Sequence, residues 1–204
     1  INAVRKKKAS YKGIQPLFLV EIVAYHKDTC EIHRVREIKN YPAYQNIPFD
    51  LSKSAQALFL SEILYKTLKE QESSPRLFGF IKNALMFFDL VEGPAVNFHL
   101  FFLFRLTEYL GFLPDIRNAG FEGWFDLQKG TVVPIEPEHP FFVNKQATDI
   151  ICALSMLKIK ELATLKMTRS MRSYLTSKFV DYYRLHFENL GEIKSLKVLH
   201  DVFK

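Results

Sequence analysis

The segment Gly93–Phe104 is the longest stretch of the chain without a charged residue. On a predicted helix from Gly93-Pro94 to Gly111, its Phe and Leu side chains point nearly all round the axis, as in a helix at the centre of a bundle. Its 12 residues are well short of the roughly 20 that span a bilayer. The sequence therefore predicts a bundle with a buried central helix and excludes a membrane span.

Further helices are predicted on both sides of that segment. Leu51–Gln71 has apolar residues at helical spacing after a plausible N-cap, Asp50. Ser74-Pro75 is a cap followed by proline at the first helical position, so a helix should run from there to about Leu90. The predicted C-terminal helices are about Lys145–Leu157, Lys160–Lys166, Arg169–Phe187 with Thr168 as its cap, and Lys194–Phe203.

The first 44 residues are β-like. Leu17–His26 is apolar on both faces, which is typical of a strand buried on both sides, and Cys30–Lys39 is the predicted returning strand. So few strands do not make an independent sheet. Either this block packs on the rest of the chain, or it needs strands that belong before Ile1.

The region Asp115–Asn144 interrupts the helical pattern with several Gly and Pro residues. Within it, Trp124–Leu127 and Thr131–Val133 predict a short β-hairpin. The expected fold class is thus α+β, mostly α. Its expected parts are a β-rich block at 1–44, a helical bundle from 45–114 and 145–204, and a finger-like insertion at 115–144.

No catalytic or metal-binding motif is found in the chain. The phosphate-binding glycine loops, the nucleophile elbow and the zinc-protease motif are all missing, and the six histidines lie far apart in sequence. The two cysteines, Cys30 and Cys152, are too few for a disulfide framework and are typical of buried apolar positions in a reduced intracellular compartment. We therefore expect no enzyme activity and no cofactor.

Charge is unevenly distributed along the chain. Residues 1–44 and 153–204 each carry a net charge of +5, whereas residues 45–152 carry −4. Two basic ends indicate a polyanionic partner, most often nucleic acid or an acidic membrane face. Ordinary solvated surface charge explains the same pattern equally well.

Two groups of basic residues are candidate binding sites. The first lies in the β-rich block beside Tyr11, which could stack on a base; it comprises Arg5, Lys6, Lys7, Lys8 and Lys12. The second is a stripe on one face of the Arg169–Phe187 helix, formed by Arg169, Arg172 and Arg184. The stripe could hold an acidic peptide or a phosphate backbone. A mobile terminus and a plain amphipathic helix are the alternatives for the two groups.

Several short stretches, in order along nearly the whole chain, resemble the RecO family of bacterial recombination mediators. Ile1–Lys8 resembles the end of a strand and the basic loop of that family's OB barrel. The stretches that resemble its helices are Leu58–Leu64, Leu110–Pro114, Tyr182–His186 and Lys194–Leu199.

The resemblance implies an N-terminal OB-type barrel, of which the first strands are missing here, followed by a helical bundle. It implies a non-catalytic, cytoplasmic, nucleoid-associated protein that binds single- and double-stranded DNA and anneals complementary strands. It also implies two protein partners, RecR and the acidic C-terminal tail of the single-stranded-DNA-binding protein. The first basic group matches the family's DNA-facing loop, whereas Arg169, Arg172 and Arg184 are assigned to the tail on geometry alone.

The chain departs from the family in its finger. Many members bind zinc there through two cysteine pairs, but Asp115–Asn144 has no cysteine. We expect no zinc and a finger held by packing of Phe121, Trp124 and Phe125. The competing hypothesis for the whole chain is a helical adaptor that binds an acidic peptide or an anionic membrane surface and has no nucleic-acid role.

Overall fold

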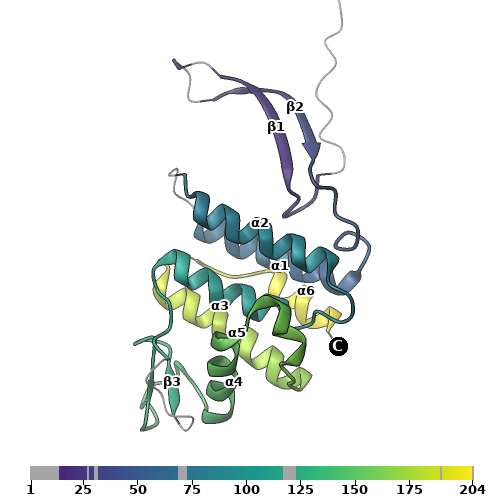
Figure 1. Cartoon of the computed structure of the whole chain (residues 1–204). Coiled ribbons are helices and arrows are strands. Elements are labelled where there is room, and N and C mark those ends of the chain that lie inside the picture. The colour runs from purple at the N-terminus through teal and green to yellow at the C-terminus, as the bar shows by residue number, and fades with distance from the viewer. Residues whose placement is uncertain are drawn as a thin grey trace, which may run out of the picture.

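The computed structural model describes residues 14–26, 28–29, 32–68, 73–116, 123–188 and 190–203. They form a helical bundle with a two-stranded sheet at one end and a small three-stranded sheet at the other (Figure 1). The elements run β1 (Val20–Tyr25), β2 (Arg34–Asn40), α1 (Leu51–Thr67), α2 (Pro75–Leu90), α3 (Phe98–Leu110), β3 (Trp124–Asp126), β4 (Thr131–Val133), β5 (Phe142–Val143), α4 (Lys145–Met156), the 3-10 helix η1 (Ile159–Thr164), α5 (Arg169–His186) and α6 (Ser195–Val202).

Helix α3 is the central helix that its composition predicts. It contacts α1, α2, α4, α5 and η1, and its phenylalanine and leucine side chains are buried all round the axis. Helix α2 runs antiparallel to it, because Phe88 stacks on Phe98 at a centroid distance of 3.9 Å while Phe80 stacks on Tyr109 at 4.8 Å. Aromatic side chains therefore join the two helices along their whole length.

The helix N-caps follow the sequence prediction. The side chains of Asp50, Ser74 and Thr168 each accept a hydrogen bond from the backbone N–H three residues later. Two predicted boundaries are wrong: α1 ends at Thr67 and not at Gln71, and α3 begins at Phe98 and not at Gly93-Pro94. Gly93 has a φ of +79°, which lies outside the helical region, so the chain turns there and enters the helix five residues later.

The N-terminal β-hairpin pairs β1 with β2 in antiparallel register, from Val20 opposite Asn40 to Tyr25 opposite Arg34. The prediction that its first strand is buried on both sides is wrong: Ile22 is 50% exposed and Tyr25 is 55% exposed. Two strands cover only each other's edges and leave both faces open. The described residues contain no closed barrel, so the OB-type barrel is not confirmed.

The C-terminal end of α2 anchors the loop that follows this hairpin. The carboxylate of Asp89 accepts hydrogen bonds at 2.8 Å from the backbone N–H groups of Gln45, Asn46 and Ile47. Lys53 reaches across from α1 and donates to the carbonyls of Asp89 and Val91, each at 3.0 Å. These bonds satisfy both the loop's donors and the last carbonyls of the helix.

The finger contains the predicted hairpin, β3–β4, and a third strand, β5, on the other side of β3. Trp124 packs edge-on against Phe142, and the buried Phe125 packs against Tyr182 of α5. Phe121 lies outside the described residues. Two of the three aromatics expected to hold the finger therefore do so, by attaching it to its own third strand and to the bundle.

Candidate peptide pocket and nucleic-acid interface

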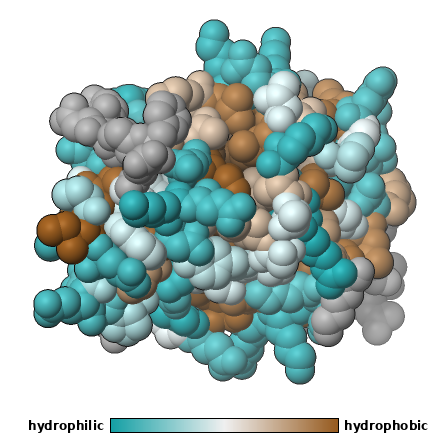
Figure 2. Space-filling view, turned by 90° about the horizontal axis from the view of Figure 1, so that it is seen from below, coloured by the Kyte–Doolittle hydropathy of each residue, from teal (hydrophilic) through white to brown (hydrophobic). Residues whose placement is uncertain are grey.

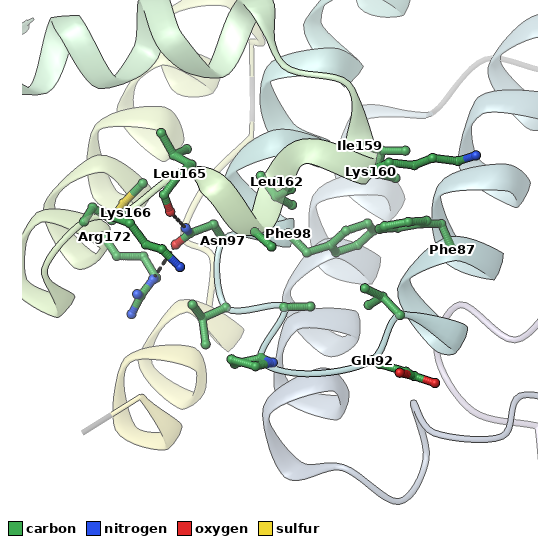
Figure 3. A pocket seen from close by; sticks show the side chains of 16 residues that line it. Phe87, Glu92, Asn97, Phe98, Ile159, Lys160, Leu162, Leu165, Lys166 and Arg172 are labelled. Atoms are coloured by element: carbon green, nitrogen blue, oxygen red, sulfur yellow. Dashed lines mark hydrogen bonds between the residues drawn. The ribbon is translucent and has the colours of Figure 1, made fainter.

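A pocket of about 280 Å³ opens between the end of α2, the loop that leads into α3, the helix η1 and the start of α5 (Figure 3). Its walls are apolar and include Phe87, Phe98 and Leu162. Three cations line it: Lys160 and Lys166 from the η1 segment, and Arg172 from α5. This combination suits an apolar side chain that carries or adjoins a negative charge.

Asn97 fixes the position of Arg172. Its buried side chain donates a hydrogen bond to the carbonyl of Leu165 at 2.8 Å and accepts one from Nε of Arg172 at 2.8 Å (Figure 3). Asn97 precedes α3, but its side chain makes no capping bond with that helix. The amide therefore ties η1 to α5 and leaves the terminal guanidinium nitrogens of Arg172 to other partners.

Arg172 is a half-buried cation that forms no salt bridge with the described residues. Its guanidinium carbon lies 5.6 Å from the ring centroid of Phe203, and no carboxylate of the described residues lies within 4.0 Å of it. Burial, and next the charge of Arg169, lower the pKa of Arg172. Because a charge taken partly out of water is stabilised by a counter-charge, the pocket favours an anion.

A buried polar network lies directly behind the pocket. The ring nitrogens Nδ1 and Nε2 of His99 lie 3.0 Å from Oε1 of Gln56 and 2.9 Å from Oγ1 of Thr176, so one imidazole joins α1, α3 and α5. Gln56 also donates to the carbonyl of Ala95, which lines the pocket. Burial, and next the charge of Arg172, lower the pKa of His99 to about 3, so His99 is neutral at physiological pH.

The structure brings together only part of the predicted arginine stripe. Arg169 is exposed and lies near enough to Arg172 to act on its charge. Arg184 is twelve residues further along α5, about 18 Å away at the helical rise, and its guanidinium pairs with Asp181 at 3.2 Å. Arg184 is therefore no part of the pocket.

Sequence reasoning missed Lys160 and Lys166. No periodicity marks them, because they lie on a 3-10 helix and on the segment that follows it. Only their net positive charge was visible in the sequence. Their role depends on how η1 packs against α2 and α3.

The β-hairpin exposes two arginines beside an aromatic ring, although Glu21, Asp28 and Glu37 balance the charge of Arg34, Arg36 and Lys39. Tyr25 and Arg34 lie directly opposite each other on neighbouring strands, and both are exposed, as is Arg36. An aromatic ring beside arginines is a common platform for nucleic-acid bases and phosphates. The sequence showed these arginines only as an interruption of the strand's apolar alternation.

The five basic residues of the first predicted group, Arg5, Lys6, Lys7, Lys8 and Lys12, lie outside the described residues. Their assignment to DNA therefore stays a prediction.

Comparison with known families gives the decisive similarity. The family described as "Recombination protein O C terminal" matches residues 48–197, from the loop before α1 to the middle of α6. The chain belongs to the RecO family.

Named relatives support the assignment over nearly the whole RecO chain. It is 33% identical to the DNA repair protein RecO of Azobacteroides pseudotrichonymphae over 98% of its length and 83% of the relative's. It is 30% identical to the RecO protein of Bacteroides fragilis and 32% identical to that of Flavobacterium psychrophilum, with 85% and 84% of those proteins covered. No solved structure matches.

Potential metal ligands do not gather in the described part of the chain. No cluster of three or more His, Cys, Asp or Glu side chains there could hold a metal ion. None of the helices formed by these residues combines the length and the apolar character of a bilayer-spanning segment.

Proposed function

We propose that this RecO-family chain is a non-catalytic mediator of DNA repair and recombination in the cytoplasm, associated with the nucleoid. It binds single- and double-stranded DNA, promotes annealing of complementary strands and, with RecR and the single-stranded-DNA-binding protein, helps to load the recombinase. The observation that carries this proposal is the family match over 48–197 together with relatives named for DNA repair.

The exposed hairpin supports the DNA-binding part of the proposal. Annealing requires positive charge that holds two repelling backbones close, and an open surface that leaves the bases free to pair. Arg34, Arg36 and Tyr25 supply both kinds of group on one exposed element. The basic residues at Arg5–Lys8 and Lys12 precede the same element in sequence and would add to its charge.

The first test is the salt dependence of DNA affinity. Replacing Arg5, Lys6, Lys7 and Lys8 with alanine, or Arg34 and Arg36 with alanine, should weaken binding to labelled oligothymidylate. It should also flatten the plot of log affinity against log salt by about 0.7 for each phosphate that the variant no longer neutralises. Fluorescence anisotropy at several salt concentrations measures both effects.

The control for this test replaces two exposed lysines with alanine: Lys129, between β3 and β4, and Lys145, at the start of α4. Unchanged slopes in both variants, the Arg5–Lys8 replacement and the Arg34/Arg36 replacement, would contradict the assignment of these residues to DNA. If labelled DNA does not bind while anionic vesicles do, the chain is instead an adaptor for acidic surfaces.

The pocket around Arg172 supports the second interaction, with the acidic C-terminal tail of the single-stranded-DNA-binding protein. A tail that ends in an apolar residue after several acids has the two features that the pocket complements. The apolar walls would take the last side chain, and Arg172 with Lys166 would take the terminal carboxylate.

Arg172 and Arg184 give a matched pair for testing the pocket. We expect Arg172→Gln to weaken binding of a fluorescein-labelled Asp-Asp-Leu-Phe peptide at least tenfold, because an ion pair with a half-buried cation is removed. Arg184→Gln should leave the affinity within about twofold, because Arg184 already pairs with Asp181. Equal effects of the two substitutions would show that the peptide responds only to overall charge.

A further inference from the structure

Two histidines face each other at the tip of the β1–β2 hairpin. Tyr25 and Arg34 are the last paired residues of the two strands. His26 and His33 are the next residues on those strands, and Nδ1 of His26 lies 3.1 Å from Nε2 of His33. The centroids of the two rings are 4.4 Å apart. Strand pairing therefore brings together two imidazoles that the sequence separates.

The distance between these two nitrogens matches the distance between two ligands of one metal ion. Zn²⁺ lies about 2.0–2.1 Å from each imidazole nitrogen that binds it. Two such nitrogens are about 3.3 Å apart at a tetrahedral angle and about 2.9 Å apart at a right angle. The observed 3.1 Å lies between these values. A change of side-chain torsion angles is then enough for one ion to take a lone pair from each ring, without movement of the strands.

Asp28 holds one of the rings in the tautomer that a metal ion needs. Its Oδ1 lies 2.9 Å from Nε2 of His26. When His26 is neutral, Nε2–H donates to this carboxylate, and Nδ1 keeps its lone pair on the side that faces His33. Carboxylates commonly orient metal-binding histidines in this way. His33 then has to carry its proton on Nδ1, so that Nε2 presents the second lone pair.

We propose that His26 and His33 form a site for one Zn²⁺ ion that clamps the tip of the hairpin. Imidazole nitrogens suit zinc, and water takes the remaining coordination positions. The pair falls short of a complete structural zinc site, since the described residues contain no cluster of three or more potential ligands. Asp28 offsets part of the added charge, and the neighbouring Arg34 is exposed to water, which screens its repulsion.

A clamp at this position has a structural effect because little else holds the tip. The two strands form a sheet of their own, and Ile22 and Tyr25 on the first strand remain half exposed. The hairpin projects from the bundle (Figure 1), and both histidines are exposed, so an ion can enter from solvent. An ion that binds only the paired strands stabilises the paired state. Zn²⁺ should therefore hold β1 and β2 in register.

The test is a calorimetric titration of the untagged full chain with Zn²⁺. It uses a Cys30→Ser background, because this cysteine lies between the two histidines in the sequence and thiolates bind zinc themselves. We expect one ion per chain. His26→Ala and His33→Ala should each lower the affinity at least tenfold, because a single imidazole loses the high effective concentration of the second ligand. Asp28→Asn should lower the affinity less and keep one ion per chain.

His139→Gln is the matched control. His139 also lies beside an aspartate, with Nε2 3.4 Å from Oδ1 of Asp126, but it belongs to the finger. Its replacement should leave the affinity within about twofold, because the two sites are independent. Thermal melts followed by circular dichroism verify that every variant is folded. Weak binding of several ions that neither hairpin substitution changes would overturn the inference and show adventitious binding only, as would equal losses in all variants.

Hydrogen exchange tests the clamp separately from binding. Zn²⁺ should slow the exchange of backbone amides in β1 and β2 at least threefold and leave those in α3 unchanged, and His33→Ala should remove the effect. Zinc binding that depends on both histidines but does not protect the hairpin would overturn the clamp. None of these measurements involves DNA or a peptide, so their outcome is independent of the proposed function.

Discussion

At the scale of single residues, His99 has an unusual position for a titratable side chain. It is fully buried, both ring nitrogens lie at hydrogen-bonding distance from side-chain oxygens of α1 and α5, and its ring stacks on Phe203 at a centroid distance of 5.8 Å. Arg172 and His200 are the charged groups that act on it, and both oppose its protonation. The fold therefore holds a neutral imidazole where a charged one would be unpaired.

This burial predicts an acid-sensitive fold. The pKa of His99 falls from an ordinary 6.5 to about 3 in the folded chain, so below pH 6.5 the unfolded chain binds a proton that the folded chain excludes. The contribution of His99 to stability is thus complete above pH 6.5 and is lost as the pH falls toward 3. Between pH 6.5 and 5 the free energy of unfolding should fall by roughly 1.5 kcal/mol from this group.

Urea unfolding at several pH values measures that fall. His99→Gln keeps hydrogen-bonding capacity without a titrating group, so its stability should change less over the same range than that of the unaltered chain. Parallel curves for the two proteins would show that His99 is already protonated in the fold or that other groups dominate.

At the scale of elements, α6 depends on a cap from another helix. It follows Lys194, whose side chain makes no capping bond, and the carboxylate of Glu62 on α1 supplies the acceptors instead. Glu62 accepts from the backbone N–H of Lys194 at 3.1 Å, from that of Ser195 at 2.8 Å and from the Ser195 hydroxyl. Burial alone would raise the pKa of Glu62, but these bonds and the charge of Lys66 outweigh it and lower the pKa.

Removing this charge should loosen the C-terminal end of the chain. Glu62→Gln should cost about 1–2 kcal/mol of stability at neutral pH, since a charged acceptor at a helix N-terminus becomes a neutral one. Because the pKa of Glu62 is lowered in the fold, the difference between the two proteins should disappear as the pH falls below its ordinary value of 4.5. Glu108→Gln, an exposed change on α3, is the control, and equal losses in both variants would refute the cap.

The elements that the sequence predicted well are those with local signals. Ser74 and Pro75 set the start of α2, and Gly111 with φ of +85° sets the end of α3, so both boundaries were visible in a few residues. The start of α3 was not visible, because the side chain of Asn97 bonds to Leu165, just after η1, and to α5, and does not cap its own helix. The exposure of β1 was missed for a related reason: apolar residues on both faces do not reveal how many strands are present to cover them.

At the scale of the whole molecule, the candidate site depends on contacts between different elements, which the residue pattern of a single helix does not contain. A helical projection places Arg169, Arg172 and Arg184 in one stripe but has no axial coordinate, so it joined two arginines that lie about 18 Å apart. Likewise, the pocket around Arg172 needs α2, η1 and α5 together, and 68 residues separate the partners Asn97 and Leu165. Long-range packing of this kind leaves no periodicity in the sequence.

The surface seen from the finger end combines wide hydrophilic areas with smaller apolar areas (Figure 2). The β1–β2 hairpin lies at the opposite end of the bundle (Figure 1). A nucleic acid on the hairpin and a peptide along the bundle would therefore contact different elements.

Helix α2 nevertheless connects the hairpin to the pocket. The carboxylate of Asp89, near its last turn, binds the segment Gln45–Ile47 that leads out of the hairpin, while Phe87 on the same helix lines the pocket around Arg172. The same end of the helix therefore contacts both the segment that follows the hairpin and the pocket. A displacement of the hairpin would therefore act, through Gln45–Ile47, on the end of α2 that lies beside the pocket.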